Sequence, residues 1–407
     1  MLRVFVTGYG IVSAFGKNWS EFRANLLKKQ NAVKYIKEWE QYQELTTYLG
    51  APILNYEHPK EWNRKQLRSL GRVSQYSVEA AGLALKMAGL YEDERIQDGR
   101  MGVASGSSTG STDAVMQLAK LLFMGESDCN ANSYIKSMPH TTAANIAIFY
   151  GLKGRMIPTS SACTSASHAI GYSYEAIKYG QIPMMLAGGA EELCPSECYV
   201  FNSLYATSQK NSTPNLTPSP FDANRDGLVI GEGACMLVLE SEESMLSRGT
   251  TPIAEIVGFG STCDGVHITK PEAKTMQSAM ELALKDAQIS PNDISYLNAH
   301  ATATKWGDIV ESYATNKVFG DKIAISSLKS YIGHTLGACG AIESIASIEM
   351  MNEGLFAPTI NLKEIDKECA KLDYLQDFRE INTNYVMNNN FAFGGVNTSL
   401  IFKKIQQ

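Results

Sequence analysis

The chain has 407 residues, of which 44% are hydrophobic and 19% charged, and its formal net charge is −6. This composition is typical of a soluble globular protein, and the acidic balance argues against a general nucleic-acid-binding protein. No apolar run reaches the length of a membrane span. The eight cysteines lack paired spacings, which predicts reduced thiols, no structural metal site and a cytoplasmic protein.

The chain opens with an apolar stretch interrupted by small residues, which predicts a strand and a turn rather than a signal peptide. Its motif VTGYG at Val6–Gly10 recurs as IVGFG at Ile256–Gly260. Each half also has a Ser-Ser doublet that leads into a small-residue helix, and each helix is followed by a stop glycine, Gly180 or Gly354. These repeats predict two similar α/β halves that meet near residue 250.

A basic segment, EWNRKQLRSLGR, follows the first strand region. Read as one helix, it places Arg64, Arg68 and Arg72 on a single stripe with Lys65 beside it. Such a stripe would suit docking of an acidic partner, although any soluble protein also needs solvated helix faces.

Cys163 follows a strand-like stretch, Met156–Thr159, and lies where a helix over Thr164–Tyr179 is predicted to begin. The N-terminus of a helix carries unsatisfied N–H groups and partial positive charge, which would stabilise a thiolate and lower the cysteine pKa. A small buried cysteine in a helix–sheet contact fits the local sequence equally well.

Two histidines are candidates for the same site. His300 lies where an apolar strand gives way to small and hydroxyl residues, and His334 precedes a helix rich in glycine and alanine. Either could also be structural. In the C-terminal FAFGGVN, the pair Gly394-Gly395 could bring backbone N–H donors close to a ligand, or could form a hairpin turn.

Five motifs in order, SSACTSASHAIG, SPFDANRDGLVIGEGACMLVLE, YLNAHATATKWGDIVE, SSLKSYIGHTLGACGAIES and NNNFAFGGVNTSLIF, resemble the β-ketoacyl-acyl carrier protein synthase I/II family of the thiolase superfamily. The resemblance implies an α/β, thiolase-like layered αβαβα fold of two related halves, each with a five-stranded mixed sheet. Residues 1–250 would carry the nucleophilic cysteine and residues 251–407 the two histidines. It also implies a homodimer, with a heterodimer as the alternative.

In that family, an acyl group passes from an acyl carrier protein to the thiol at Cys163, and His300 and His334 promote decarboxylation of a malonyl unit. The resemblance gives Lys329 and Glu343 an orienting role, and gives Glu311 a supporting one near the lysine. It makes Phe393 both an oxyanion donor and an acyl gate. It implies no cofactor, since the substrates arrive on phosphopantetheine. It assigns substrate contacts to Thr302, Thr304, Ser107, Phe201, Thr269 and Gly394, and carrier-protein docking to Lys65, Arg68 and Arg72.

Four departures from the family pattern affect positions that shape the substrate site. Ala301 replaces a glycine, Lys305-Trp306 replaces a proline and a small residue, Ser107 an aliphatic residue and Tyr205 an arginine. With these departures, the chain resembles the ketosynthases of aryl polyene clusters. The main alternative is a non-catalytic chain-length-factor subunit, but such subunits typically lack the cysteine. Thiolases, synthase III relatives and Cys–His hydrolases fit less well, because they would need other partner residues.

Overall fold

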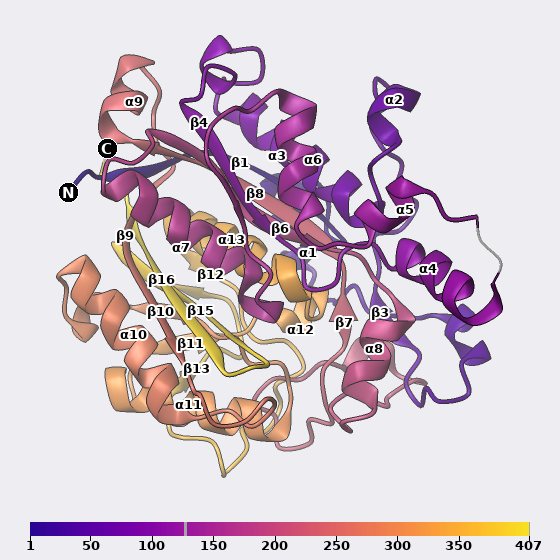
Figure 1. Ribbon diagram of the computed structural model, residues 1–407. Coiled ribbons are helices and arrows are strands. Elements are labelled where there is room, and N and C mark those ends of the chain that lie inside the picture. Colours follow the sequence, from indigo (N-terminus) through magenta and orange to yellow (C-terminus); the bar gives the residue numbers. More distant parts are fainter. Residues whose placement is uncertain (126–127, 407) are drawn as a thin grey trace.

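The computed structural model describes residues 1–125 and 128–406 and is built around one mixed sheet of eleven strands (Figure 1). The spatial order is β13-β11-β10-β15-β16-β9-β1-β8-β6-β4-β5. In the first half the strands are β1 (Val4–Ser13), β4 (Met101–Gly106), β5 (Met156–Pro158), β6 (Met184–Glu191) and β8 (Gly233–Ser241). In the second they are β9 (Ala254–Cys263), β10 (Tyr296–Asn298), β11 (Ala324–Ser326), β13 (Asp373–Tyr374), β15 (Tyr385–Ala392) and β16 (Val396–Lys404).

The two ends of this sheet have the same topology. From β1 outward, β8 and β6 follow as antiparallel neighbours, and β4 and β5 are added in parallel. From β9 outward, β16, β15, β10 and β11 repeat that order and those directions. Both five-stranded sheets are therefore present, and the VTGYG and IVGFG motifs occupy the equivalent strands β1 and β9.

Two details differ from the expectation of separate five-stranded sheets. The two-residue strand β13 adds a sixth strand beside β11. The halves also join, because Val4–Val6 of β1 pairs with Ala254–Ile256 of β9. This short ladder satisfies backbone groups that two free sheet edges would leave unpaired.

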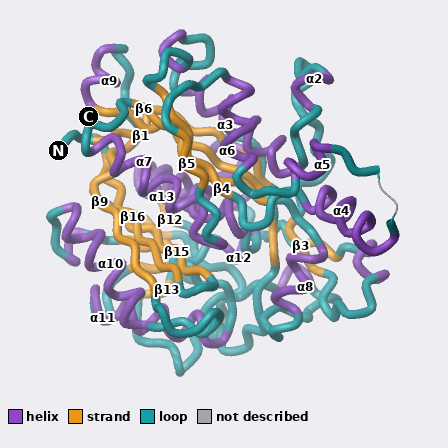
Figure 2. The backbone as a smooth tube through the Cα atoms, in the orientation of Figure 1, coloured by secondary structure: helices purple, strands orange, loops and turns teal. Residues whose placement is uncertain are grey.

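Helices complete the five layers. The central layer is formed by α7 (Ser165–Lys178) and α13 (Cys339–Glu353), which contact strands of both halves. On the outer face of the first half lie α3 (Arg72–Met87) and α6 (Thr141–Tyr150), and α10 (Ala273–Ala287) covers β9 and β16 of the second half. Figure 2 shows the strands as one curved band with helices on both of its faces. The layered fold predicted from the sequence is confirmed.

The central helices are rich in small residues because they are packed on every side. A Cβ atom at Gly171 would lie 2.3 Å from the Phe259 ring, and one at Gly340 would lie 2.1 Å from the Ser167 hydroxyl. As predicted, glycines end both helices, since Gly180 has φ 69° and Gly354 has φ 75°.

The remaining elements are shorter and surround the layers. The helices are α1 (Trp19–Leu27), α2 (Arg64–Leu67), α4 (Thr112–Met124), α5 (Ala131–Lys136), α8 (Pro195–Asn202), α9 (Glu242–Ser247), α11 (Lys305–Phe319) and α12 (Lys329–Ile332). The small strands are β2 (Lys34–Tyr35), β3 (Leu49–Ala51), β7 (Ile230–Gly231), β12 (Leu355–Phe356) and β14 (Arg379–Glu380). Within the described ranges, none of the helices combines the length and the apolar character that crossing a bilayer requires.

The prediction of one continuous basic stripe is wrong. Helix α2 ends at Leu67, and a new helix, α3, begins only at Arg72 after a non-helical linker. Gly71 precedes α3 in an extended conformation, and a Cβ atom there would lie 2.4 Å from the Cβ of Ser111. Arg72 is half-buried and donates to the Tyr76 hydroxyl at 2.6 Å, but it shares a surface cavity with Arg68, so its role in docking stays a prediction.

Candidate active site

Cys163 lies in a 3₁₀ turn, Ala162–Thr164, between β5 and α7. Ala162 has φ 51°, a left-handed conformation that turns the chain sharply just before the cysteine. The residue is 5% exposed, and its carbonyl oxygen accepts a hydrogen bond from Cys339 Sγ at 3.2 Å. The predicted position at the start of a helix is therefore correct, with α7 itself beginning at Ser165.

The two predicted histidines meet at this cysteine. Nε2 of His334 lies 3.0 Å from Sγ of Cys163, and the His300 and His334 rings are nearly perpendicular with centroids 5.1 Å apart. One ligand atom from each of the three residues lies within 4.8 Å of the other two. Residues far apart in sequence thus form one compact group.

Backbone contacts fix where each histidine sits. His300 follows β10, and Glu311 of α11 accepts the N–H groups of His300 and Ala301 at 2.8 and 2.7 Å. His334 follows α12, and its N–H donates to the carbonyl oxygen of Val229 at 2.7 Å. The expected support from Glu311 therefore acts on the backbone of the first histidine.

The expected lowering of the cysteine pKa is not found. Burial raises the pKa of the Cys163 thiol to about 12, against opposing effects of the Lys329 charge and of the backbone N–H groups of Phe393 and Cys163. A 3₁₀ turn buried among apolar residues gives less charge stabilisation than an exposed helix terminus. The resting thiol is therefore protonated. Both of these backbone N–H groups act on the sulfur, as the predicted oxyanion pair requires.

Both imidazoles are neutral at physiological pH. Burial, and then the nearby Lys329 ammonium, hold the pKa of His300 and of His334 well below the ordinary value. Their Nδ1 atoms are buried without a hydrogen-bond partner among the described residues. A neutral imidazole offers one donor and one acceptor, so each histidine can give or take a proton.

Lys329 is buried beneath this group. Its Nζ atom lies 2.5 Å from Oε1 of Glu343, and the other carboxylate oxygen accepts from the Asn390 side chain at 2.8 Å. Burial disfavours the ammonium charge, but Glu343, Cys339 and Glu311 together outweigh it and raise the pKa of Lys329. The lysine therefore stays charged and acts on the histidines through space.

The cysteine–histidine group could in principle hold a metal ion, since thiolate and imidazole ligands suit zinc. The positive charge of Lys329, which acts on Cys163, His300 and His334, opposes binding of a further cation there. The site fits acyl chemistry better than metal ligation.

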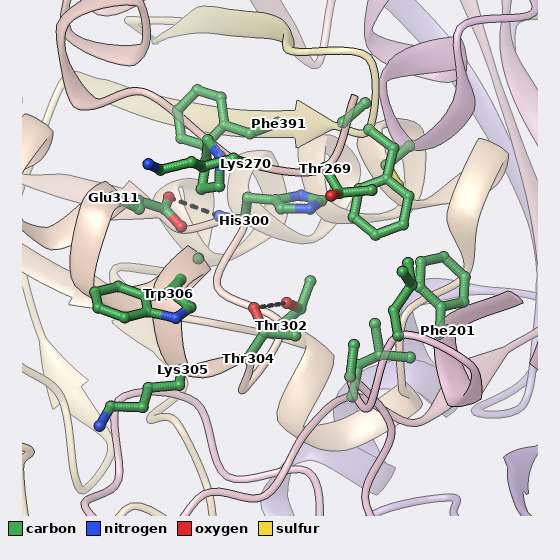
Figure 3. A pocket seen from close by; sticks show the side chains of 18 of the residues that line it. Phe201, Thr269, Lys270, His300, Thr302, Thr304, Lys305, Trp306, Glu311 and Phe391 are labelled. Carbon is green, nitrogen blue, oxygen red and sulfur yellow. Dashed lines mark hydrogen bonds between the residues drawn. The ribbon is translucent and has the colours of Figure 1, made fainter. Parts of the chain in front are cut away.

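A pocket of about 590 Å³ leads to the three residues. Thr302 and Thr304 line it with their hydroxyls 3.0 Å apart, and Figure 3 shows them between the His300 side and the Phe201 side of the pocket. Phe201 of α8 and Phe393 pack with ring centroids 5.2 Å apart. The structure thus brings several predicted substrate contacts to one cavity: Phe201, Thr269, Thr302, Thr304 and Phe393.

Two predicted contacts lie elsewhere. Ser107 is fully buried outside this pocket, where its hydroxyl donates to Glu191 at 2.6 Å. Gly394 lies in the turn after β15, and its N–H donates to the Ile268 carbonyl oxygen at 2.7 Å, so it shapes the rim rather than lining the cavity.

Sequence reasoning overlooked Asn390 and the loop that carries Lys270. Asn390 is fully buried in β15 and bonds both Glu343 and Ser167. The run of three asparagines at the end of an otherwise apolar strand could have indicated a buried polar network. Lys270 lines the pocket from a loop that has no motif to single it out.

Family models describe nearly the whole chain. The beta-ketoacyl synthase N-terminal domain matches residues 1–244, and the C-terminal domain matches residues 253–363. The chain belongs to the beta-ketoacyl synthase family.

Relatives of known name agree with this assignment. The 3-oxoacyl-[acyl-carrier-protein] synthase 1 of Haemophilus influenzae is 35% identical over 99% of both chains. A crystal structure of a beta-ketoacyl synthase from Burkholderia phymatum is 54% identical, covers both chains completely and superposes with a TM-score of 0.99. A ketosynthase in complex with its type II polyketide synthase acyl carrier protein is 29% identical over 99% of this chain and 100% of its own, with a TM-score of 0.89.

Proposed function

We propose that the chain condenses an acyl group, held as a thioester on Cys163, with malonyl-acyl carrier protein to give CO₂ and a β-ketoacyl-acyl carrier protein. The observation that carries this proposal is the 3.0 Å contact between Cys163 Sγ and His334 Nε2, with His300 beside it at the end of a pocket. The named 3-oxoacyl synthase relatives support it.

Acyl transfer begins from a protonated thiol, so a base is needed. His334 is neutral and within hydrogen-bond distance of Sγ, so it can take the thiol proton as the sulfur attacks the thioester carbon of the acyl carrier protein. The N–H groups of Cys163 and Phe393 would hold the oxyanion of the tetrahedral intermediate. Collapse breaks the bond to the carrier sulfur, which leaves with the proton from His334.

In the second half-reaction, the malonyl group loses CO₂ and the electron pair forms an enolate. A neutral imidazole can donate one N–H to the enolate oxygen, and His300 and His334 together offer two such donors. The enolate carbon then attacks the Cys163 thioester, the carbon–sulfur bond breaks, and the thiolate takes up one proton from solvent, which is the proton that the overall condensation consumes. Burial and the Lys329 charge keep both imidazoles neutral before this step, so each can donate an N–H.

The chain-length-factor alternative is not favoured, because the cysteine, both histidines and the Lys329–Glu343 pair are present and meet in space. A hydrolase would need a carboxylate or amide to orient the base, and Nδ1 of His334 has no hydrogen-bond partner in the described part of the chain.

The partner is an acyl carrier protein in this proposal, as it is in the complex of the related polyketide ketosynthase. We also propose a homodimer. Strand β5 forms an open edge of the large sheet, and α4 exposes Leu122, Phe123 and Met124 at 81%, 88% and 66%. Open strand edges and large exposed apolar residues favour association. In a heterodimer, a homologous subunit would take the position of the second copy. We also propose a cytoplasmic location.

The proposal is tested by incubating the purified chain with acyl- and malonyl-acyl carrier proteins and following enzyme mass, CO₂ and product. An acylated enzyme and a β-ketoacyl product are expected. Free acid without a β-keto product would indicate a hydrolase, and neither acylation nor product would indicate a non-catalytic subunit. Comparing saturated, unsaturated and aryl primers in the same assay tests the proposed aryl polyene branch.

A further inference from the structure

Three glutamate residues lie close together beside the active site. Glu191 ends β6, Glu192 follows it, and Glu197 is on α8. Burial raises the pKa of the Cys163 thiol, and the Glu191 charge adds to this effect, so Glu191 is close to the nucleophile. Glutamate is almost never fully buried unless it is paired, yet all three side chains are buried here. Each of them therefore needs partners that account for its burial.

Two of these glutamates are fully paired within the protein. Glu191 accepts hydrogen bonds from the Ser107 hydroxyl at 2.6 Å on one oxygen and from the Gly337 N–H at 3.0 Å on the other. Both oxygens of Glu192 accept from backbone N–H groups, at 2.7 and 2.9 Å. Their burial is explained by these bonds, which hold neighbouring loops together.

Glu197 differs from the other two. It is 4% exposed, and its Oε1 atom accepts from the Thr109 hydroxyl at 2.6 Å. Its Oε2 atom is buried and has no hydrogen-bond partner among residues 1–125 and 128–406. Burial, and then the Glu191 charge, raise the pKa of Glu197 well above its ordinary value, so the side chain is a neutral carboxylic acid. It has an O–H donor to offer, and a buried polar group of this kind requires a partner.

Helix α8 connects this acid to the nucleophile. Glu197 and Phe201 are four residues apart and share one face of the helix, separated by roughly 6 Å along its axis. Phe201 lines the pocket together with Cys163, as Figure 3 shows for the aromatic ring. Cys198, which follows Glu197, packs in the same apolar cluster as Cys163 and Phe201. The acid thus lies one helical turn beyond the ring that lines the pocket.

The surroundings of the nucleophile change from apolar to polar along this direction. Leu336 and Phe201 pack around Cys163 and suit the first carbon atoms of a bound acyl group. One turn further along α8, the Thr109 hydroxyl and two carboxyl groups replace the apolar side chains. A plain hydrocarbon chain that extended this far would end against polar groups.

We propose that Glu197 is a specificity-determining residue that binds an oxygen atom at the far end of the acyl group on Cys163. The preferred substrates are then acyl groups that end in a hydroxyl, such as a hydroxylated aryl group, rather than plain hydrocarbon chains. The inference rests on the proposed function. A hydroxyl oxygen can accept the O–H of the acid, whereas a hydrocarbon end leaves that donor buried and unpaired, and a site built for hydrogen bonding rejects such a substrate.

The test measures kcat/KM for acylation of the full chain with two matched pairs of donors on a bacterial acyl carrier protein. The rigid pair is para-hydroxycinnamoyl and cinnamoyl, and the flexible pair is ω-hydroxyoctanoyl and octanoyl. The members of each pair differ by one oxygen atom. We expect a roughly tenfold higher kcat/KM for the hydroxylated member of at least one pair, which is about the ratio that one hydrogen bond supplies.

Two variants separate hydrogen bonding from packing. Glu197→Met places an apolar side chain of similar length at this position, so the preference should be lost, mainly because the plain donors react faster. Glu197→Gln retains an N–H donor and should keep most of the preference. Ser196→Ala removes an exposed hydroxyl from the preceding position of α8 and is the matched control, with an unchanged ratio for both pairs. Denaturant unfolding checks that each variant is folded.

The other outcomes overturn the inference. Equal kcat/KM for both members of each pair in the unaltered chain would show that no terminal oxygen is recognised, although the proposed function would stand. A Glu197→Met variant that keeps the parent ratio would assign the preference to another residue. Equal losses with all four donors in both variants would give Glu197 a structural role only. If no donor acylates the unaltered chain, the proposed function itself fails.

Discussion

The two halves of the molecule use the same turn for different purposes. In each, a 3₁₀ turn precedes the central helix and opens with a left-handed residue, Ala162 at φ 51° or Leu336 at φ 44°. The second residue of the turn is Cys163 in the first half and Gly337 in the second. A Cβ atom at Gly337 would lie 2.8 Å from Glu191 Oε2, so that position has no room for a nucleophile.

The adjoining strand ends differ in a complementary way. Followed from the VTGYG and IVGFG motifs through the paired strands, the registers make Gly106 the equivalent of His300. A Cβ atom at Gly106 would lie 1.6 Å from the carbonyl oxygen of Thr159, so that position has no room for a side chain, whereas the His300 ring faces His334. A duplicated scaffold thus presents one reactive site, with the nucleophile from one half and the imidazoles from the other.

The largest expected effect comes from removing the nucleophile. Cys163→Ala should abolish the acyl-enzyme mass shift and reduce condensation by about 10⁴-fold or more. The fold should survive because alanine fits the same turn. Cys263→Ala, which alters an exposed cysteine in the second half, should keep the mass shift. A mass shift that persists in Cys163→Ala would move the nucleophile elsewhere.

The two histidines should contribute to different half-reactions. His300→Ala should reduce CO₂ release from malonyl-acyl carrier protein by about 10²- to 10³-fold, because one enolate donor is lost. Acylation should survive, since His334 rather than His300 contacts the sulfur. Burst acylation and CO₂ release, measured separately, test this, and the exposed His140→Ala is a control. Lost acylation with intact CO₂ release would reverse the assigned roles.

The buried ion pair should affect stability as well as rate. Lys329→Met leaves Glu343 without its charged partner, and breaking a buried pair typically costs about 3–5 kcal/mol of unfolding free energy. Replacing both residues, as Lys329→Met/Glu343→Gln, should recover part of that loss without restoring activity. Denaturant unfolding and condensation assays measure the two effects. Equal stability of the single variant and the parent would mean that the pair is not buried in solution.

The pH dependence should reveal the protonated thiol. Because burial raises the pKa of Cys163 to about 12, the rate of its alkylation by iodoacetamide should keep rising through pH 8.5 instead of levelling. Because the histidine pKa values lie well below 6.5, acylation should persist as the pH falls through 6.5 and be lost only in stronger acid. A plateau of alkylation near neutral pH would instead indicate a stabilised thiolate.

The smallest effect is expected at the surface of the first half. Lys65→Glu/Arg68→Glu should raise KM for the acyl carrier protein several-fold at low ionic strength, and the difference should fade at high ionic strength. Reaction with a small pantetheine thioester should change little. Arg64→Glu reverses a charge on the same short helix and shows whether any charge reversal there raises KM for the acyl carrier protein. Equal losses with both donors would place the defect in the fold.

The sequence alone predicted the two-half α/β fold and the glycines that end its central helices from local patterns, and it predicted the reactive residues from five ordered motifs that resemble a known family. It could not determine properties that arise from distant segments. The thiol pKa depends on burial by several elements, so the helix-terminus argument predicted the wrong direction for Cys163. The basic stripe failed because residues 68–71 are not helical, and Gly71 at the start of the next helix packs against Ser111, forty residues away in the chain. Ser107 matched a substrate-facing position by motif, but its hydroxyl is bonded to Glu191 from a neighbouring strand. Only the packed tertiary structure decides which polar group meets which partner, since burial makes each such pairing obligatory.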